Sequence, residues 1–517
     1  MLCYIIYEIG GRILNTIYAA IDLGSNTLKL KIVQYENNAI HIIDDITKDV
    51  NVGEDVFAKG NIEHETVKEI IDIMVKFKDV MNSYNVETYR AVATGAMRTA
   101  KNNLNVIEIV LMRAGIKIEI IEDTIEKFLT YKSMRDNIED YRKIRESSIL
   151  VELNSGSCDV SVYNKNKLVF NEEFTLGTLV LKNIMQDIED RSVNYPKVIS
   201  ELIESRTGHM WKYIKKRKIE SFLMLGGETK VLKNSLFGGR ETISRSDFES
   251  VYRRVITDHL RFRKEIEEYG MDWYEFVACI LVYKVFLKLA DTKDMTFPVI
   301  NLRDGMIAEM IEKDYSLERY KVFNNDVISL ARNTSARYKS CNKHCREVEK
   351  NGIKIMNELK KHFTFNERDE LLMRLAAILH EIGKFTRAKD YLAASFHKIR
   401  NLSIMGTNYH EMMLVAYICK MLTDRYSSRV SIERLSQNDQ NRILKLSSIL
   451  SIADALDKSK KQKIKIEDFR VTDDELGIIV SKSADTTLEE WNLENRAKEF
   501  INTFGLVPKL IEAGYDE

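Results

Sequence analysis

The chain has 517 residues, of which 44% are hydrophobic and 30% charged, so a disordered or fibrous protein is excluded. Its 78 lysine and arginine residues balance 78 aspartate and glutamate residues, which excludes the strong net charge of a dedicated nucleic-acid binder. No apolar run reaches the roughly 18 residues of a membrane span, and the cysteines show no disulfide spacing, so we expect a cytoplasmic protein.

Residues 1–16 lack the pattern of a signal peptide, because no basic segment precedes an apolar run and a small-residue cleavage site. We interpret these residues as an N-terminal extension. The first regular pattern lies at Tyr18–Val33, where an apolar strand, a polar turn and an alternating strand follow one another.

The next segments alternate between strands and helices. A third strand is predicted at Ala39–Thr47, and apolar residues spaced by three and four predict an amphipathic helix over Val67–Met81. Two short buried strands, with a helix between them, are predicted at Tyr89–Met97 and Ile116–Asp123. This alternation predicts an α/β domain whose sheet is covered by helices.

The opening pattern returns at Ser147–Phe170, where ILVELNSGSCDVSV aligns with the earlier AAIDLGSNTLKLKIV. An internal repeat of this kind predicts two domains of one fold, which we expect to face one another across a cleft. After about Ser316 long helical patterns such as Leu371–Phe385 dominate, and a hairpin is predicted at Lys463–Lys482. The lysine run within 458–463 is interpreted as a solvated face, with tracking of a polyanion as the alternative.

The two polar turns contain residue types that bind anions. Gly24 and Gly156 would let the backbone approach a ligand, and Ser25, Asn26 and Ser157 would add hydrogen-bond donors. For a single copy, a structural hairpin with a capped turn would be the simpler interpretation. Two copies in one chain favour phosphate binding.

An acidic residue stands beside each turn, Asp22 in the first copy and Glu152 in the second. A carboxylate repels phosphate unless a cation lies between the two groups. Since Mg²⁺ prefers oxygen ligands and phosphate groups, this pattern suggests Mg²⁺ as the cofactor.

From Tyr18 onward the chain resembles the exopolyphosphatase/guanosine pentaphosphate phosphohydrolase (Ppx/GppA) family. The resemblance rests on AIDLGSN, VATGAMRTAKN, IEIIEDTIEKFLTY, VELNSGSCDVSV, FTLGTLVL and LRDGMIAEMI. It implies an α/β protein with duplicated actin-like (ribonuclease H-like) domains and a mostly helical HD-like domain after them. The expected parts are an N-terminal extension (1–16), actin-like phosphatase domains I (17–145) and II (146–315), and the helical HD-like domain (316–517).

The resemblance also implies site residues. It gives the catalytic role to Glu126 and adds Arg98 to the phosphate-binding residues Gly24, Ser25, Asn26, Gly156 and Ser157. It places the metal ion with Asp22, Glu152 and Asp159. Taken alone, Asp123-x-x-Glu126 would fit a helix capping box and Arg98 a surface arginine, so only the joint pattern favours catalysis.

In the C-terminal half, the resemblance places the metal-ligand positions of an HD-type domain at His344, His380, Glu381 and Asp454. These four residues could hold a second metal ion. The alternative is a helical domain that keeps the same polar side chains as packing and hydrogen-bonding groups.

The implied function is hydrolysis of a terminal phosphoanhydride bond, with release of phosphate from inorganic polyphosphate in the presence of Mg²⁺. Guanosine pentaphosphate is the alternative substrate, because it has the same scissile group. The second loop has two glycines fewer than the family pattern, and its acids are exchanged, giving Glu152 and Asp159. A catalytically weakened regulatory protein that binds polyphosphate or an alarmone is therefore a further alternative. A superfamily kinase is disfavoured by the glutamate-bearing segment, and the family implies a homodimer without nucleic-acid or membrane partners.

Overall fold

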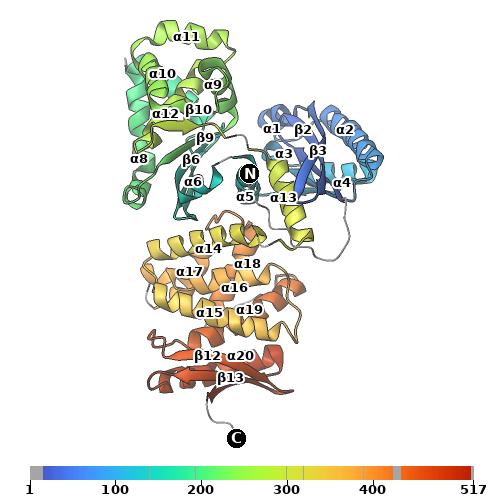
Figure 1. The fold of residues 1–517 in the computed structure, drawn as a ribbon, viewed down its shortest axis with the longest axis vertical. Helices are drawn as coiled ribbons and strands as arrows, with labels where there is room; N and C mark the ends of the chain where they lie inside the picture. The colour runs from blue at the N-terminus through green and yellow to red at the C-terminus, as the bar shows by residue number, and fades with distance from the viewer. Residues whose placement is uncertain are drawn as a thin grey trace. The chain divides into compact units, whose positions relative to one another are not determined.

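The computed structural model describes residues 16–138, 140–192, 194–298, 300–317, 319–387, 389–422 and 432–513. Residues 1–15, which make up almost all of the expected N-terminal extension, lie outside this part. The chain divides into two compact units, Met1–Tyr141 with Phe297–Phe323 and Arg142–Thr296 with Asn324–Glu517. Figure 1 shows the helices and strands of both units.

The first unit is built on a five-stranded sheet with the order β3-β2-β1-β4-β5. Strand β1 is antiparallel to β2 and parallel to β4. The strands are β1 (Thr16–Leu23), β2 (Thr27–Glu36), β3 (Ala39–Asp49), β4 (Thr88–Ala93) and β5 (Ile118–Ile120). The helices between them are α1 (Val52–Lys59), α2 (His64–Ser83), α3 (Gly95–Thr99), α4 (Asn103–Ala114) and α5 (Asp123–Asn137).

The core of this unit forms because the apolar stripe of α2 and the apolar residues of the strands share one cluster. Ile70, Met74 and Phe77 of α2 are buried in the same cluster as Ile21 and Leu30 of the sheet. The predicted helix over 67–81 is therefore confirmed. The apolar run predicted as a strand at 89–97 instead ends as β4 at Ala93, after which α3 begins.

The second unit contains a six-stranded sheet with the order β10-β11-β9-β6-β7-β8. The strands are β6 (Ser147–Leu153), β7 (Cys158–Asn164), β8 (Lys167–Phe174), β9 (Ser221–Leu225), β10 (Thr242–Ser244) and β11 (Asp294–Thr296). The accompanying helices are α6 (Tyr141–Glu146), α7 (Thr178–Ile188), η1 (Glu189–Arg191), α8 (Tyr195–Ile214), α9 (Gly227–Phe237), α10 (Arg245–Thr257), α11 (His259–Glu268) and α12 (Trp273–Leu287).

The two sheets share one topology. In the first sheet, β3, β2 and β1 are antiparallel neighbours, and β4 runs parallel to β1. In the second sheet, β8, β7 and β6 are antiparallel neighbours, and β9 runs parallel to β6. Because this order needs the same hairpin-and-crossover path twice, the match confirms the predicted duplication and the actin-like fold class.

Helix α13 (Leu302–Asp314) lies far along the chain but packs in the first unit, against α5 and β1 (Figure 1). Its Gly305 allows this approach, because a β-carbon there would lie 1.9 Å from the carbonyl oxygen of Leu129. Buried Lys132 and Glu312 form an ion pair of 2.7 Å between α5 and α13. This placement differs from the expected span 146–315 of the second domain.

The C-terminal part is mostly helical, as predicted, and ends in a small sheet (Figure 1). Its helices are α14 (Arg319–Arg337), α15 (Asn342–Leu359), α16 (Asp369–Leu379), η2 (Ile382–Phe385), α17 (Tyr391–Arg400), α18 (Tyr409–Lys420), α19 (Gln437–Ala455) and α20 (Thr487–Phe504). The strands β12 (Ile464–Val471), β13 (Glu475–Lys482) and β14 (Val507–Glu512) form a sheet in that order, which extends the predicted hairpin by one strand. Across the described residues, we find no helix with the length and apolar character needed to cross a membrane.

Candidate functional site

The turn between β1 and β2 is held in shape by hydrogen bonds from its own backbone and from two neighbouring segments. Within the turn, the Gly24 N–H donates to the Thr27 carbonyl at 2.9 Å. The Gly53 N–H donates to the Ser25 carbonyl at 2.7 Å, and the Ala96 N–H donates to Ser25 Oγ at 2.9 Å. The predicted phosphate-binding turn is therefore a fixed feature of the first unit and not a loose hairpin end.

Arg98 and Glu126 are brought together by α3 and α5. Arg98 Nη1 donates to Glu126 Oε2 at 3.3 Å and to the Ile121 carbonyl at 2.9 Å. Arg98 Nη2 lies 3.7 Å from Asp123 Oδ1. Both the arginine and the glutamate are partly exposed, with side-chain exposures of 27% and 30%, so each can still reach a ligand.

The capping-box interpretation of Asp123-x-x-Glu126 does not fit the structure. Helix α5 begins at Asp123, and its N-cap residue is Glu122. Asp123 therefore does not occupy the position from which a capping box is formed. A helix cap therefore does not explain the glutamate at position 126. In the structure its side chain contacts Arg98.

The surroundings of Glu126 favour its neutral form. Burial raises the pKa of Glu126, and the positive charge of Arg98 opposes that shift. The carboxylates of Asp123 and Asp22 raise the pKa further, because a neighbouring negative charge disfavours ionisation. A raised pKa makes a carboxylate a stronger proton acceptor, which suits a general base.

Asp22 is the penultimate residue of β1, next to the turn, and its carboxylate has the donor atom that a cation site needs. Its Oδ1 atom is buried and has no hydrogen-bond partner within the described part of the chain. Burial raises the pKa of Asp22, with Lys29 and Arg303 acting in the opposite direction. Because an unpartnered buried carboxylate oxygen is costly, a bound divalent cation would stabilise this residue.

The second turn repeats the first one in the hydrogen bonds of its backbone. The Asn154 N–H donates to the Ser157 carbonyl at 2.9 Å, the same bond that joins Gly24 to Thr27. Asn154 is therefore the structural equivalent of Gly24. Gly156, two residues later, does not occupy the position that glycine has in the first turn.

The glycines that the second turn requires come from other segments. A β-carbon on Gly177 would lie 2.3 Å from the Gly156 carbonyl carbon, and one on Gly226 would lie 1.9 Å from the Leu153 carbonyl oxygen. By contrast, a β-carbon on Gly156 would meet nothing within 4 Å. Neither Gly177 nor Gly226 was predicted as a site residue, although the family motif FTLGTLVL contains Gly177 and the glycine pair in MLGGETKVL (224–232) contains Gly226.

We expect Gly177→Ala to destabilise the second unit by about 1–3 kcal/mol, because a methyl group there would force the turn to move. Gly156→Ala is the matched control. It adds the same methyl group on the turn that Gly177 packs against, but at a position where the methyl group meets open space. Chemical denaturation of both variants would measure the difference. Equal stability of the two variants would contradict the packing described here.

Two carboxylates lie opposite one another on the second sheet. Glu152 of β6 pairs in register with Asp159 of β7, whereas the corresponding Asp22 of the first sheet pairs with Lys29. Asp159 is only 1% exposed. Since directly opposed residues share one face of an antiparallel pair and like charges repel there, this arrangement suits a bound cation.

The four predicted ligands of the helical domain come together. The ligand atoms of His344, His380 and Glu381 all lie within 4.8 Å of one another. Asp454 Oδ1 lies 3.2 Å from His344 Nε2 and 3.7 Å from His380 Nε2. The four predicted ligands therefore lie close together in the structure. Whether they can hold a metal ion depends on the charges around them.

Cations already surround the two carboxylates of this cluster. Glu381 Oε1 pairs with Lys384 and, at 2.6 Å, with Lys460. Asp454 Oδ2 lies 3.5 Å from Lys458 Nζ and 3.4 Å from the Arg496 guanidinium. With four cations against the three carboxylates of Glu381, Asp454 and Asp457, a divalent metal would enter a site whose acids are already paired, which disfavours it.

The two histidines of the cluster differ in protonation. Burial lowers the pKa of His344, but hydrogen bonds to Asp454 and Asp457 outweigh it and raise the pKa to about 9. Burial lowers the pKa of His380 to about 4. Metal coordination through Nε2 would require His344 to lose a proton, whereas its contacts with Asp454 and Asp457 fit a buried network of ion pairs.

Two α/β units with one strand order, each with a polar turn after its first strand, define a protein of the actin-like class. Residues 31–314 match the Ppx/GppA phosphatase family, and residues 329–498 match Ppx/GppA phosphatase, domain III. The chain therefore belongs to the Ppx/GppA phosphatase family.

Among curated proteins, the chain is 19% identical over 448 residues to the guanosine-5'-triphosphate,3'-diphosphate pyrophosphatase of Photobacterium profundum, covering 84% of this chain and 86% of that protein. Among solved structures, it is similar to the Aquifex aeolicus member of the Ppx/GppA family, with 18% identity and a TM-score of 0.47. That match covers 58% of this chain and 98% of the other. An exopolyphosphatase from Cytophaga hutchinsonii matches with 20% identity, the same two coverages and a TM-score of 0.43.

Proposed function

We propose that this chain hydrolyses a terminal phosphoanhydride bond and releases phosphate from inorganic polyphosphate. The observation that carries the proposal is the Arg98–Glu126 pair at 3.3 Å, in the same unit as the ordered turn at Gly24–Asn26. An arginine, a proton acceptor and a turn rich in hydrogen-bond donors are the groups that phosphoryl transfer to water requires.

In the proposed reaction, Arg98 binds oxygens of the terminal phosphate, because its guanidinium can contact two of them at once. Ser25 and Asn26 donate further hydrogen bonds to the phosphate. Glu126 orients a water molecule and takes its proton as the water oxygen attacks phosphorus. The bond between phosphorus and the bridging oxygen breaks, and the shortened chain leaves with that oxygen.

We propose Mg²⁺ as the cofactor, held by Asp22, Glu152 and Asp159. The ion would supply positive charge that offsets the charge developing on the phosphate oxygens. The buried, unpartnered Oδ1 of Asp22 among the described residues and the in-register carboxylates of β6 and β7 support this assignment. We predict that Gly156 and Ser157 bind the same substrate as the first turn.

Guanosine pentaphosphate is the second candidate substrate. It is favoured by the similarity, over 84% of this chain, to a curated protein named guanosine-5'-triphosphate,3'-diphosphate pyrophosphatase. A third candidate function is that of a regulatory protein that binds either compound without fast turnover, because Asn154 stands where the first turn has Gly24. The homodimer and the cytoplasmic location stay predictions.

The proposal is tested by measuring phosphate release from long-chain polyphosphate and from guanosine pentaphosphate, each with Mg²⁺ and with excess EDTA. We expect release from polyphosphate at the higher kcat/KM, and loss of release in EDTA. A higher kcat/KM for guanosine pentaphosphate would favour the second candidate. Binding by calorimetry without any release would overturn hydrolysis and favour the regulatory protein.

A further inference from the structure

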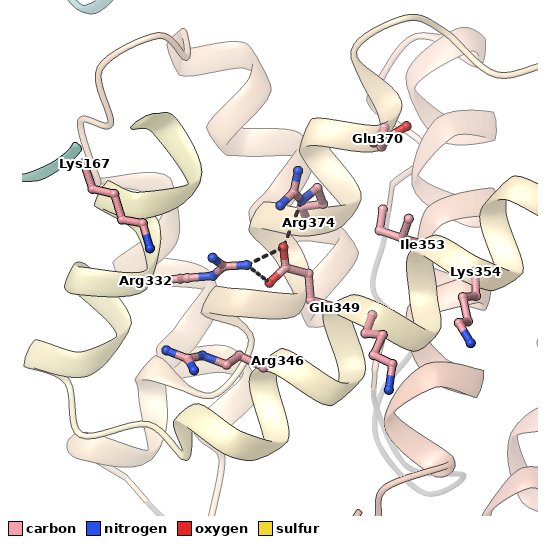
Figure 2. Close-up of a pocket in the computed structure, with 9 residues that line it drawn as sticks. Lys167, Arg332, Arg346, Glu349, Ile353, Lys354, Glu370 and Arg374 are labelled. Atoms are coloured by element: carbon pink, nitrogen blue, oxygen red, sulfur yellow. Dashed lines mark hydrogen bonds and ion pairs between the residues drawn. The ribbon is translucent and has the colours of Figure 1, made fainter. Parts of the chain in front are cut away.

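A positively charged hollow lies on the second unit, lined mainly by helices α14, α15 and α16 (Figure 2). Its volume is about 620 Å³, which falls within the range of small-molecule sites. Two glutamates and one isoleucine complete its described lining, and the rest is cationic. The cationic side chains are Lys167, Arg332, Arg346, Lys350, Lys354 and Arg374.

A buried glutamate holds two of the arginines in position. Glu349 is 5% exposed, and it accepts from Arg332 Nη2 at 2.9 and 2.7 Å and from Arg374 Nε at 2.9 Å. Figure 2 shows both guanidinium groups directed at this carboxylate. Because Glu349 fixes both side chains, their remaining N–H groups are positioned without a further loss of side-chain entropy when a ligand binds.

These arginines retain donors for a ligand. Each uses a single nitrogen for Glu349, and a guanidinium has five N–H donors. Arg332 Nε is buried and has no hydrogen-bond partner among the residues that the structure describes. A buried donor in this state is costly, so Glu349 alone does not satisfy the Arg332 guanidinium.

The other described cations of the hollow form no ion pair with the two glutamates that line it. Arg346 is exposed and forms no ion pair within the described ranges. Lys350 pairs at 3.1 Å with Glu347 on its own helix, and Lys354 donates to the Ile466 carbonyl at 2.6 Å. Glu349, Glu370 and the Lys350 partner Glu347 do not balance six cations, so the hollow keeps a positive field.

We propose that this hollow binds a compact inorganic oligophosphate, such as tripolyphosphate, as a second anion site of the protein. Forked arginine donors match phosphate oxygens in pairs, and closely spaced phosphates supply several charges within a small volume. None of the described lining residues is aromatic, so the hollow has no surface on which a base would stack. The site consists of residues outside the predicted catalytic set, so it would bind the anion whether or not the chain is a hydrolase.

The experiment is a calorimetric titration of inorganic tripolyphosphate into the full chain carrying Arg98→Ala, in a buffer without divalent cations. Arg98→Ala removes the arginine of the proposed catalytic site, so the remaining binding reports the hollow. The test variant adds Arg346→Glu and Lys350→Glu. Its matched control adds Lys343→Glu and Lys361→Glu instead, which make the same charge change in the same domain. Lys343 has no described ion pair, and Lys361 pairs with Glu358 at the surface.

We expect one tripolyphosphate bound per chain, at least a tenfold weaker Kd in the test variant and a change below threefold in the control. Arg332→Lys, which keeps the charge but removes the fork, should give an intermediate loss. GTP should bind no more tightly than tripolyphosphate. Absence of binding to the Arg98→Ala chain, equal losses in test and control variants, or tighter binding of GTP would each overturn the proposal.

Discussion

Replacement of Glu126 by glutamine is expected to lower kcat for phosphate release by about 10²- to 10⁴-fold, the usual contribution of a general base. The Kd for polyphosphate should change only a few-fold, because glutamine keeps the shape and the contact with Arg98 that the structure shows at 3.3 Å. Steady-state kinetics and calorimetry on the same protein preparations would measure the two effects separately. Full activity of Glu126→Gln would contradict the assigned role.

The pH dependence of the unmodified protein provides an independent measurement of the same group. Since burial raises the pKa of Glu126 above its usual 4.5, the acidic limb of kcat/KM should have its midpoint above that value. Activity should fall as the pH drops through this midpoint, because the base then carries a proton, and the limb should be missing from the residual activity of Glu126→Gln. The control is Glu69→Gln, a change to an exposed glutamate of α2, which should leave the whole profile unchanged.

The second large effect is expected at the buried ion pairs of the helical domain. Asp454→Asn should lower the free energy of unfolding by about 3–5 kcal/mol, because removal of one partner leaves buried charge uncompensated. Asp454 is 5% exposed and lies within 3.5 Å of His344, Lys458 and Arg496. Thermal and urea denaturation of the full chain would measure the loss, with exposed Asp473→Asn as the control.

The same measurement separates an ion-pair network from a second metal site. If the network stabilises the domain, EDTA should leave unchanged the stability of a chain carrying Asp22→Asn, in which the proposed Mg²⁺ site does not contribute. His380→Gln should then have a smaller effect than Asp454→Asn, because His380 is neutral with a pKa of about 4. A large drop in melting temperature on chelation, with metal recovered from the purified protein, would contradict the network and favour the metal site.

Several features could be predicted from sequence because they depend on neighbouring residues or on repetition. The stripe over Val67–Met81 and the returning pattern at Ser147–Phe170 depend on spacing alone, and both correspond to elements of the structure. That Arg98 and Glu126 belong to one site was expected only through family motifs, and their direct contact was not predicted. Arg98 lies in α3 and Glu126 in α5, and α4 and β5 separate these two helices in the sequence. No pattern of neighbouring residues predicts that the two side chains meet.

The duplicated α/β fold, the polar turns and the helical C-terminal half could all be predicted, because strand alternation, helical spacing and repetition are properties of the chain itself. The packing of α13 on the first unit, the need of the second turn for Gly177, and the pairing of partly exposed Lys458 and Lys460 with buried acids appear only in the folded chain. These features depend on close approaches and charge balance between segments far apart in sequence, and no local pattern encodes such contacts.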